Sequence, residues 1–264
     1  MYETYETGIS SRYLKTVVDK LDEPICLIGG WAVYHSVNSN FNTATGRNYI
    51  GSRDIDLGFH FEVDWSEETM LESAFARSLR IIENQLGFMP VGFRYLKEFH
   101  IETEKELSDN EVKSTPTHFI FPLYIDPIVD IIHPKFHDIF KFNPIDEPLL
   151  EMVFTEKTNR ITDRSLGKNL WLPQTHVLLA TKLNSVVNRD KEHKRLKDIA
   201  DIFALLWFTD VDISEIKSRF FQFSDKKDIK RTIDSISKKE IFAVSNIIGV
   251  SPDEIEMVFL EFIR

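Results

Sequence analysis

The stretch that decides the fold is Leu27-Ile28-Gly29-Gly30-Trp31-Ala32-Val33, followed along the chain by Gly51-Ser52-Arg53-Asp54-Ile55-Asp56-Leu57. The first stretch predicts a buried strand that runs through a Gly-Gly turn into the start of a helix. The second predicts a strand on which Asp54 and Asp56 point to the same face, because they are two residues apart. Two carboxylates side by side repel each other unless a cation lies between them. The pair therefore indicates a site rather than a purely structural strand.

Composition bounds the class of protein. The chain has 264 residues, 42% of them hydrophobic, enough for one large domain or two small ones. It lacks an apolar run of about 18 residues, so we expect no membrane span. The acidic, polar N-terminus does not have the pattern of a secretory signal. A single cysteine, Cys26, excludes an intramolecular disulfide and a cysteine-based zinc site. We therefore expect a cytoplasmic protein.

The charge balance limits the partners. The formal net charge is −10, which argues against non-specific duplex binding as the main role. An acidic total still allows a local basic patch on an RNA-binding face. The segment 189–197 is net basic, and it is either a solvated junction between helices or a patch for a triphosphate or an RNA backbone.

The order of predicted elements indicates an α+β fold with a C-terminal all-helical region. We expect a mixed-sheet domain over residues 1–168 and a helical domain over residues 169–264. In the first, hydrophobic periodicity and turn residues predict helices at about 9–21, 31–37 and 66–86, a polar loop at 38–49, and strands at 25–28, 54–61, 92–102, 118–121 and 128–132. In the second they predict helices at about 174–188, 192–208, 213–221, 226–238 and 252–263.

A third carboxylate lies in a later apolar strand, and two residues compete for the role. Asp130 sits between Val129 and Ile131, where an unpaired carboxylate would be costly. Asp126 would face the same side if the strand began earlier, but Pro127 argues for a strand start at that point. We therefore favour Asp130.

These residues resemble the nucleotidyltransferase fold of the DNA polymerase β-like superfamily. The resemblance is carried by Gly29 and Gly30 at a helix start, by Asp54 and Asp56 on a strand, and by Asp130. It implies that the three carboxylates hold two Mg²⁺ ions, with Mn²⁺ as an alternative. The ions would activate an attacking hydroxyl and neutralise the leaving pyrophosphate. Such transfer depends on positioning and charge neutralisation more than on covalent help from the protein.

The second half of the chain is similar to the helical part of AbiEii-like abortive-infection nucleotidyltransferases, a group that includes toxins of toxin–antitoxin systems. Lys182 matches the lysine of their leucine-rich helix, and Asp198 and Asp201 match the acidic pair that follows. The similarity implies catalytic and nucleotide-binding roles for Lys182, which would meet the phosphates, and a nucleotide-binding role for Asp198. Lys197 stands where that group commonly has arginine, which puts a bidentate contact there in doubt.

Structural roles compete with these assignments. Lys182 would then be a surface lysine whose stem covers apolar neighbours. Asp198 and Asp201 would lie on a solvated face or pair with Arg195. Trp31 more often packs at a helix start than stacks on a base.

Residues 28–33 and 53–57 are also similar to aminoglycoside nucleotidyltransferases. In either family the Gly-Gly turn would let phosphate oxygens approach the backbone, at the positive end of the following helix. Ser36 and Arg53 are candidate phosphate contacts because they are close in sequence to the motif. The 38–49 segment widens the spacing between the two motif stretches, and we expect it to hold specificity.

The resemblances imply an NTP- and Mg²⁺-dependent enzyme that moves a nucleoside monophosphate to an acceptor hydroxyl and releases pyrophosphate. A toxin-like enzyme would modify RNA, such as a tRNA end, and would have an antitoxin protein as a partner. A resistance-like enzyme would modify a small hydroxylated molecule. The other classes are a non-catalytic nucleotide-binding module and a metal-dependent nuclease.

Overall fold

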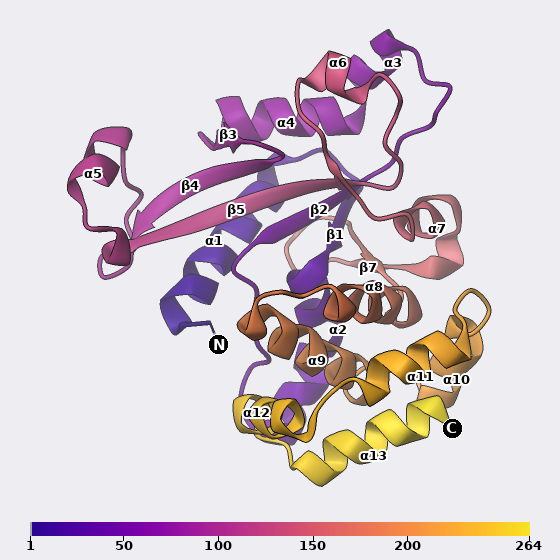
Figure 1. Ribbon diagram of the computed structural model, residues 1–264. Helices are drawn as coiled ribbons and strands as arrows, with labels where there is room; N and C mark the ends of the chain where they lie inside the picture. Colours follow the sequence, from indigo (N-terminus) through magenta and orange to yellow (C-terminus); the bar gives the residue numbers. More distant parts are fainter. Residues whose placement is uncertain (1) are drawn as a thin grey trace. The chain divides into compact units, whose positions relative to one another are not determined.

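The computed structural model describes residues 2–264 and confirms the α+β class. Helices and strands of one mixed sheet are interleaved as far as Pro173, and only helices follow (Figure 1). The chain forms two compact units, which we call the sheet unit (Tyr2–Trp31 and Gly51–Pro173) and the helical unit (Ala32–Ile50 and Gln174–Arg264). Within residues 2–264, every helix is too short or too polar to traverse a bilayer.

The sheet unit is built on eight strands in the order β3-β4-β5-β2-β1-β8-β7, with β6 paired to β5. The pairs β2–β5, β1–β8 and β5–β6 are parallel, and the others are antiparallel. The strands are β1 (Ile25–Ile28), β2 (Ile55–Phe59), β3 (Met89–Val91), β4 (Arg94–His100), β5 (Ile120–Val129), β6 (Ile145–Asp146), β7 (Arg160–Asp163) and β8 (Leu170–Pro173). The helices are α1 (Thr4–Lys20), α3 (Glu67–Glu72), α4 (Ala74–Asn84), α5 (Asp109–Ser114), η1 (Thr117–Phe119), α6 (Phe136–Phe140), α7 (Leu150–Thr155) and η2 (Lys157–Asn159).

The predicted 66–86 helix is two helices. Ser66 caps the first, as expected, and Ser73 accepts a hydrogen bond from Ala76 N as the cap of the second. Trp31 is buried, and its indole Nε1 donates to Ser10 Oγ at 3.0 Å, so it has the packing role. A buried tryptophan N–H commonly finds such a partner.

Strand β5 corrects the prediction of two short strands. It runs unbroken through Pro122 and Pro127. Pro122 pairs with β4, in a part of β5 that precedes the β2 pairing, and Pro127 pairs with β2 beyond the last β4 partner. Each proline therefore lies where the strand pairs with only one of these two neighbours, and its missing N–H can face the other side.

The helical unit contains most of α2 (Gly29–Thr45) and the helices α8 (Thr175–Val187), α9 (Glu192–Trp207), α10 (Ile213–Phe220), α11 (Lys226–Asp234), α12 (Lys238–Ile248) and α13 (Pro252–Ile263). The start of α13 is as predicted, with Ser251 at the cap and Pro252 at the first position. Helix α12 was not predicted, although Ser237 and Glu240 form a capping box at its start.

The loop predicted at 38–49 is wrong, because α2 continues to Thr45. Val33, Val37 and Phe41 are spaced four residues apart and are all buried. Phe41 makes edge-to-face contacts with Tyr49 and Phe208, with ring centroids 5.1 and 5.0 Å apart. Burial of this stripe outweighs the weak helix propensity of the asparagines and serines between its members.

The compact units divide the chain differently from the predicted 168/169 boundary. Strand β8 pairs in parallel with β1 and belongs to the sheet, so the division falls after Pro173. Residues 32–50 cluster with the C-terminal helices.

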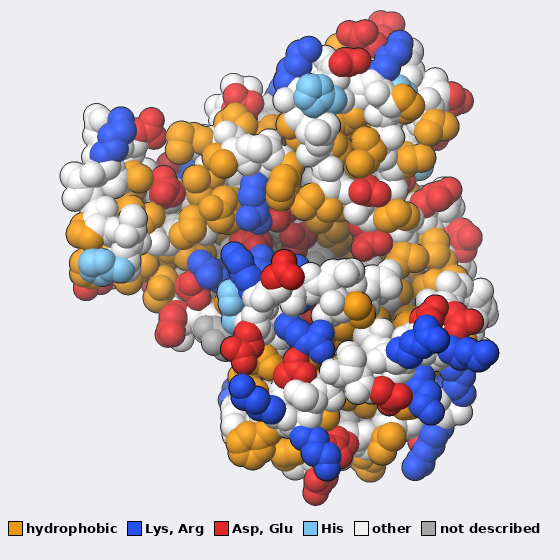
Figure 2. Space-filling model, viewed as in Figure 1, with side chains coloured by type: hydrophobic (Ala, Val, Ile, Leu, Met, Phe, Trp, Pro, Cys, Tyr) orange, Lys and Arg blue, Asp and Glu red, His pale blue; other side chains and the backbone are white. Residues whose placement is uncertain are grey.

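Basic side chains gather over α10 and α11 (Figure 2). Helix α11 buries Ile229 and Ile233 on one face. Its other face exposes Lys226, Lys227, Lys230 and Arg231. Residues 217–239 contain eight Lys or Arg and three Asp or Glu, so the segment is strongly basic in a chain whose net charge is −10.

Candidate active site

Asp56 and Asp126 lie directly across from each other on neighbouring parallel strands. The β2–β5 register pairs Asp56 with Asp126, between Ile55–Ile125 and Leu57–Pro127. Residues that pair in this way project to the same face of a sheet. Asp54 precedes β2 by one residue and is two residues from Asp56. The structure therefore brings Asp54, Asp56 and Asp126 together, and we call them the carboxylate trio.

Gly29 packs directly against this trio. It has a φ of +64°, which residues with a side chain rarely adopt, and a Cβ at this position would lie 1.9 Å from Asp56 Oδ2. A Cβ on Gly30 would lie 2.8 Å from the hydroxyl of buried Ser52. The Gly-Gly turn is thus required by the fold, and it sets the first turn of α2 beside the Asp56 carboxylate.

Arg94, at the start of β4, binds the trio as a cation. Its Nε donates to Asp126 Oδ1 at 2.8 Å and its Nη2 donates to Asp126 Oδ2 at 2.6 Å. The same Nη2 lies 3.5 Å from Asp54 Oδ2. The guanidinium carbon lies 3.9 Å from the centre of the Tyr124 ring. Such a two-point contact is among the strong charge-assisted hydrogen bonds.

Asp130 does not join the trio, contrary to the expectation from sequence. It lies four residues after Asp126, about 13 Å farther along the chain at the rise of a strand. Its Oδ1 accepts from Phe61 N at 2.8 Å, and its Oδ2 contacts His60 Nδ1. The Asp130 carboxylate is thus paired inside the sheet unit. The cost of an unpaired buried carboxylate, which favoured Asp130 as a metal ligand, does not arise. Pro127 does not mark a strand start, because β5 begins at Ile120.

The trio suits a hard cation. Its donors are carboxylate oxygens, which Mg²⁺ prefers, and a guanidinium already occupies the position of a counter-charge between Asp126 and Asp54. Within residues 2–264, no three His, Cys, Asp or Glu side chains are arranged closely enough to form a ready metal site. Of the three carboxylates predicted to hold metal, Asp54 and Asp56 lie in the trio and Asp130 does not, whereas Asp126 lies beside them.

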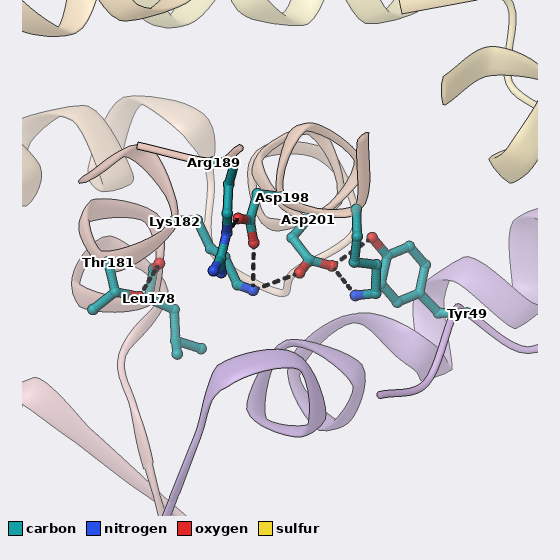
Figure 3. Close-up of polar contacts among 8 residues, drawn as sticks. Tyr49, Leu178, Thr181, Lys182, Arg189, Asp198 and Asp201 are labelled. Carbon is teal, nitrogen blue, oxygen red and sulfur yellow. Dashed lines mark hydrogen bonds and ion pairs between the residues drawn. The ribbon is translucent and has the colours of Figure 1, made fainter. Parts of the chain in front are cut away.

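Lys182, Asp198 and Asp201 form a buried ion-pair cluster in the helical unit (Figure 3). Lys182 Nζ lies 2.9 Å from Asp198 Oδ1 and 2.8 Å from Asp201 Oδ2; the second contact is an ion pair without good hydrogen-bond geometry. Arg189 Nε donates to Asp198 Oδ2 at 2.6 Å, and Lys197 Nζ pairs with Asp201 Oδ1.

Tyr49, which follows α2, completes the cluster. Tyr49 Oη donates to Asp201 Oδ1 at 2.9 Å. Arg195, the alternative partner of the aspartates, instead donates to Glu240 at 2.5 Å and to the Val186 carbonyl at 2.6 Å. Lys182 is therefore neither a snorkelling surface lysine nor an open phosphate ligand.

The burial of these groups changes their pKa values in different directions. Burial alone would lower the pKa of Lys182, but the Asp198 and Asp201 carboxylates outweigh it and raise that pKa. For Lys197 burial prevails over Asp201 and lowers the pKa. The pKa of Asp198 is lowered, because Lys182 and Arg189 overcome the effect of burial. The pKa of Tyr49 is raised by burial and then by the charge of Asp201.

The two candidate phosphate contacts have partners of their own. Ser36 Oγ donates to the Ala32 carbonyl at 2.8 Å, within α2. Arg53 Nε lies 3.2 Å from Glu6 Oε1 of α1, and its guanidinium is 5.3 Å from the centre of the Phe121 ring. These contacts give both residues structural roles.

From the sequence, Asp126 was considered and set aside in favour of Asp130, and Arg94 was missed. The alternation of Phe121, Leu123 and Ile125, all buried, was the signal that the strand begins before Asp126. Arg94 had no local signal, since its role depends on the β4–β5 register.

Comparison of the chain with protein-family models, with curated proteins and with solved structures finds no significant match.

Proposed function

We propose that this chain is a divalent-metal-dependent nucleotidyltransferase whose metal-binding carboxylates are Asp54, Asp56 and Asp126. The observation that carries the proposal is the pairing of Asp56 with Asp126 across β2 and β5, with Gly29 packed against Asp56. Carboxylates on neighbouring strands offer oxygen ligands to a cation, and the glycine turn at the helix start offers backbone N–H groups to phosphates.

The chain's own groups would position the substrates. Gly29 and Gly30 leave room for triphosphate oxygens next to the first N–H groups of α2. When bound, divalent ions would neutralise the triphosphate and lower the pKa of the attacking hydroxyl. The hydroxyl oxygen then bonds to the α-phosphorus, the bond from that phosphorus to the bridging oxygen breaks, and pyrophosphate leaves. Asp126 accepts the hydroxyl proton.

The test is label transfer from α-labelled NTPs in Mg²⁺ by the wild type and three isosteric variants. Asp56→Asn and Asp126→Asn should lower transfer by about 100-fold or more, because even outer-shell changes at metal sites cost 10- to 100-fold. Asp130→Asn is the matched control: it keeps an oxygen for Phe61 N and should retain most of the activity. Loss in Asp130→Asn with full activity in Asp126→Asn would restore the original assignment and refute ours.

The basic surface of α11 favours an RNA acceptor over a small hydroxylated molecule. Within residues 2–264, no ion pair is formed by Lys227 or Lys230, and both are exposed. Exposed lysines of this kind bind a phosphate backbone by releasing its counter-ions, whereas a small hydroxylated acceptor has no phosphate backbone for them to bind.

The acceptor test compares bulk RNA, including tRNA, with aminoglycosides as acceptors. Lys227→Ser combined with Lys230→Ser should lower RNA labelling and weaken its salt dependence, while NTP binding stays unchanged. Equal RNA labelling by the double variant and the wild type would count against the surface, and labelling of aminoglycosides alone would identify the small-molecule class. NTP binding without any transfer would identify a binding module.

A further inference from the structure

We propose that Arg94 is the resident counter-ion of the carboxylate trio and that binding of a divalent ion releases its guanidinium from Asp126 toward the phosphates of the NTP. This inference deepens the proposed function and rests on it. Arg94 thus pairs with Asp126 when no metal is bound and becomes a phosphate ligand once the metal is bound.

The first support is the way in which Arg94 binds Asp126. The fork engages both carboxylate oxygens, at 2.8 and 2.6 Å, and also lies 3.5 Å from Asp54. A divalent ion that enters between these carboxylates meets the positive charge at short range. Because the pair is only partly exposed, water screens that repulsion weakly. The guanidinium and the metal therefore compete for Asp126.

The second support is the surface on which the guanidinium lies. Its flat face is stacked on the Tyr124 ring, with the guanidinium carbon 3.9 Å from the ring centre. The stack adds stability that does not depend on Asp126. A planar cation on an aromatic face can lose one oxyanion partner and take another without being fully desolvated, and its fork matches phosphate as well as carboxylate.

A permanently structural Arg94 would behave in the opposite way. If the Arg94–Asp126 pair only held Asp126 in position, its removal would disorder a metal ligand and weaken metal binding. If Arg94 competes with the metal, its removal strengthens metal binding. The sign of the change in metal affinity therefore separates the two roles.

The experiment measures Mn²⁺ affinity of the full chain by electron paramagnetic resonance of free Mn²⁺. Arg94→Met should bind Mn²⁺ about tenfold more tightly than the wild type, because a like charge at short range is gone. Arg94→Lys keeps the charge but not the fork, and its affinity should lie between the two. Arg12→Met is the matched control: Arg12 pairs with Glu104 on the surface, and this variant should bind as the wild type does.

Thermal unfolding guards against a folding artefact. In chelator, Arg94→Met should melt below the wild type because the carboxylates then repel each other, and Mn²⁺ should remove most of that difference. Equal or weaker Mn²⁺ affinity in Arg94→Met overturns the inference, as does the absence of Mn²⁺ binding in both proteins. If Arg94→Met binds Mn²⁺ more tightly than the wild type but no acceptor is labelled, the proposed function is refuted. The competition of Arg94 and the metal for Asp126 is then still established.

Discussion

Replacing Lys182 with methionine should be among the most damaging single changes in the helical unit. The substitution keeps the length of the side chain and removes a charge that lies within 3 Å of both Asp198 and Asp201. The two carboxylate side chains are 2% and 0% exposed, so water cannot replace the lost cation. Removal of one partner from a buried pair costs about 3–5 kcal/mol. Arg189 still neutralises Asp198, and Lys197 and Tyr49 still contact Asp201, so we expect the lower end, about 3 kcal/mol.

The penalty should depend on pH with a defined sign. In the wild type the pKa of Asp198 is lowered and that of Lys182 is raised, so the pair is fully stabilising between their unfolded values of 3.8 and 10.5. In Lys182→Met a carboxylate can relieve the buried charge by taking up a proton. The difference from wild type should therefore shrink as the pH is lowered from about 7.5 to about 5.

Urea unfolding followed by circular dichroism at both pH values measures these differences. Lys230→Met, the same substitution on the exposed face of α11, is the control and should change stability by less than about 0.5 kcal/mol. A Lys182→Met loss no larger than that of the control would refute the buried ion-pair cluster. Lys182 would then have to be an accessible group, as the sequence similarity implied.

Three further outcomes are expected. Gly29→Ala should cost about 1–3 kcal/mol of stability and abolish label transfer, because its Cβ would meet Asp56 Oδ2. Gly8→Ala has open space around the new methyl group and should be neutral or stabilising in the same assays. Burial raises the pKa of Cys26 to about 12, so a thiol reagent at about pH 8 should label it only after unfolding; rapid labelling of the native chain would contradict this. Burial, with a contribution from Arg219, lowers the pKa of His176 to about 4, so NMR should find the ring neutral at pH 5. Because His176 binds a proton more readily in the unfolded chain, the stability that the neutral ring contributes is lost as the pH falls below 6.5. This pH dependence of stability should be weaker in His176→Leu.

The sequence was sufficient where local patterns determine structure. The Gly29-Gly30 turn, the Asp54–Asp56 strand and the cap at Ser251 have signals within a few residues, and all three are found in the structure. The sequence was insufficient where partners lie far apart. Arg94 reaches Asp126 only through the β4–β5 register, which no single segment contains.

Lys182 shows a different limit. The lysine and its helix were predicted, but its surroundings depend on Asp198 and Asp201 from α9, and on Tyr49, which lies 152 residues before Asp201. Burial reverses the interpretation of a lysine, because a buried ammonium is neutralised by nearby carboxylates and is no longer available to a phosphate. Similarly, the choice of Asp130 depended on a strand start that Pro127 does not set.

The assignment of residues 32–50 to the helical unit has a consequence for synthesis of the chain. The segment leaves the ribosome before residues 51–173, and the helices that cover Phe41 and Tyr49 follow only afterwards. At about 5–20 residues per second, this delay is on the order of ten seconds. During this delay the rings of Phe41 and Tyr49, in residues 32–50, are not covered by the C-terminal helices, and a chaperone would recognise them. A chain that terminates near residue 173 would keep them exposed, so such truncated products should be prone to aggregation and rapid degradation.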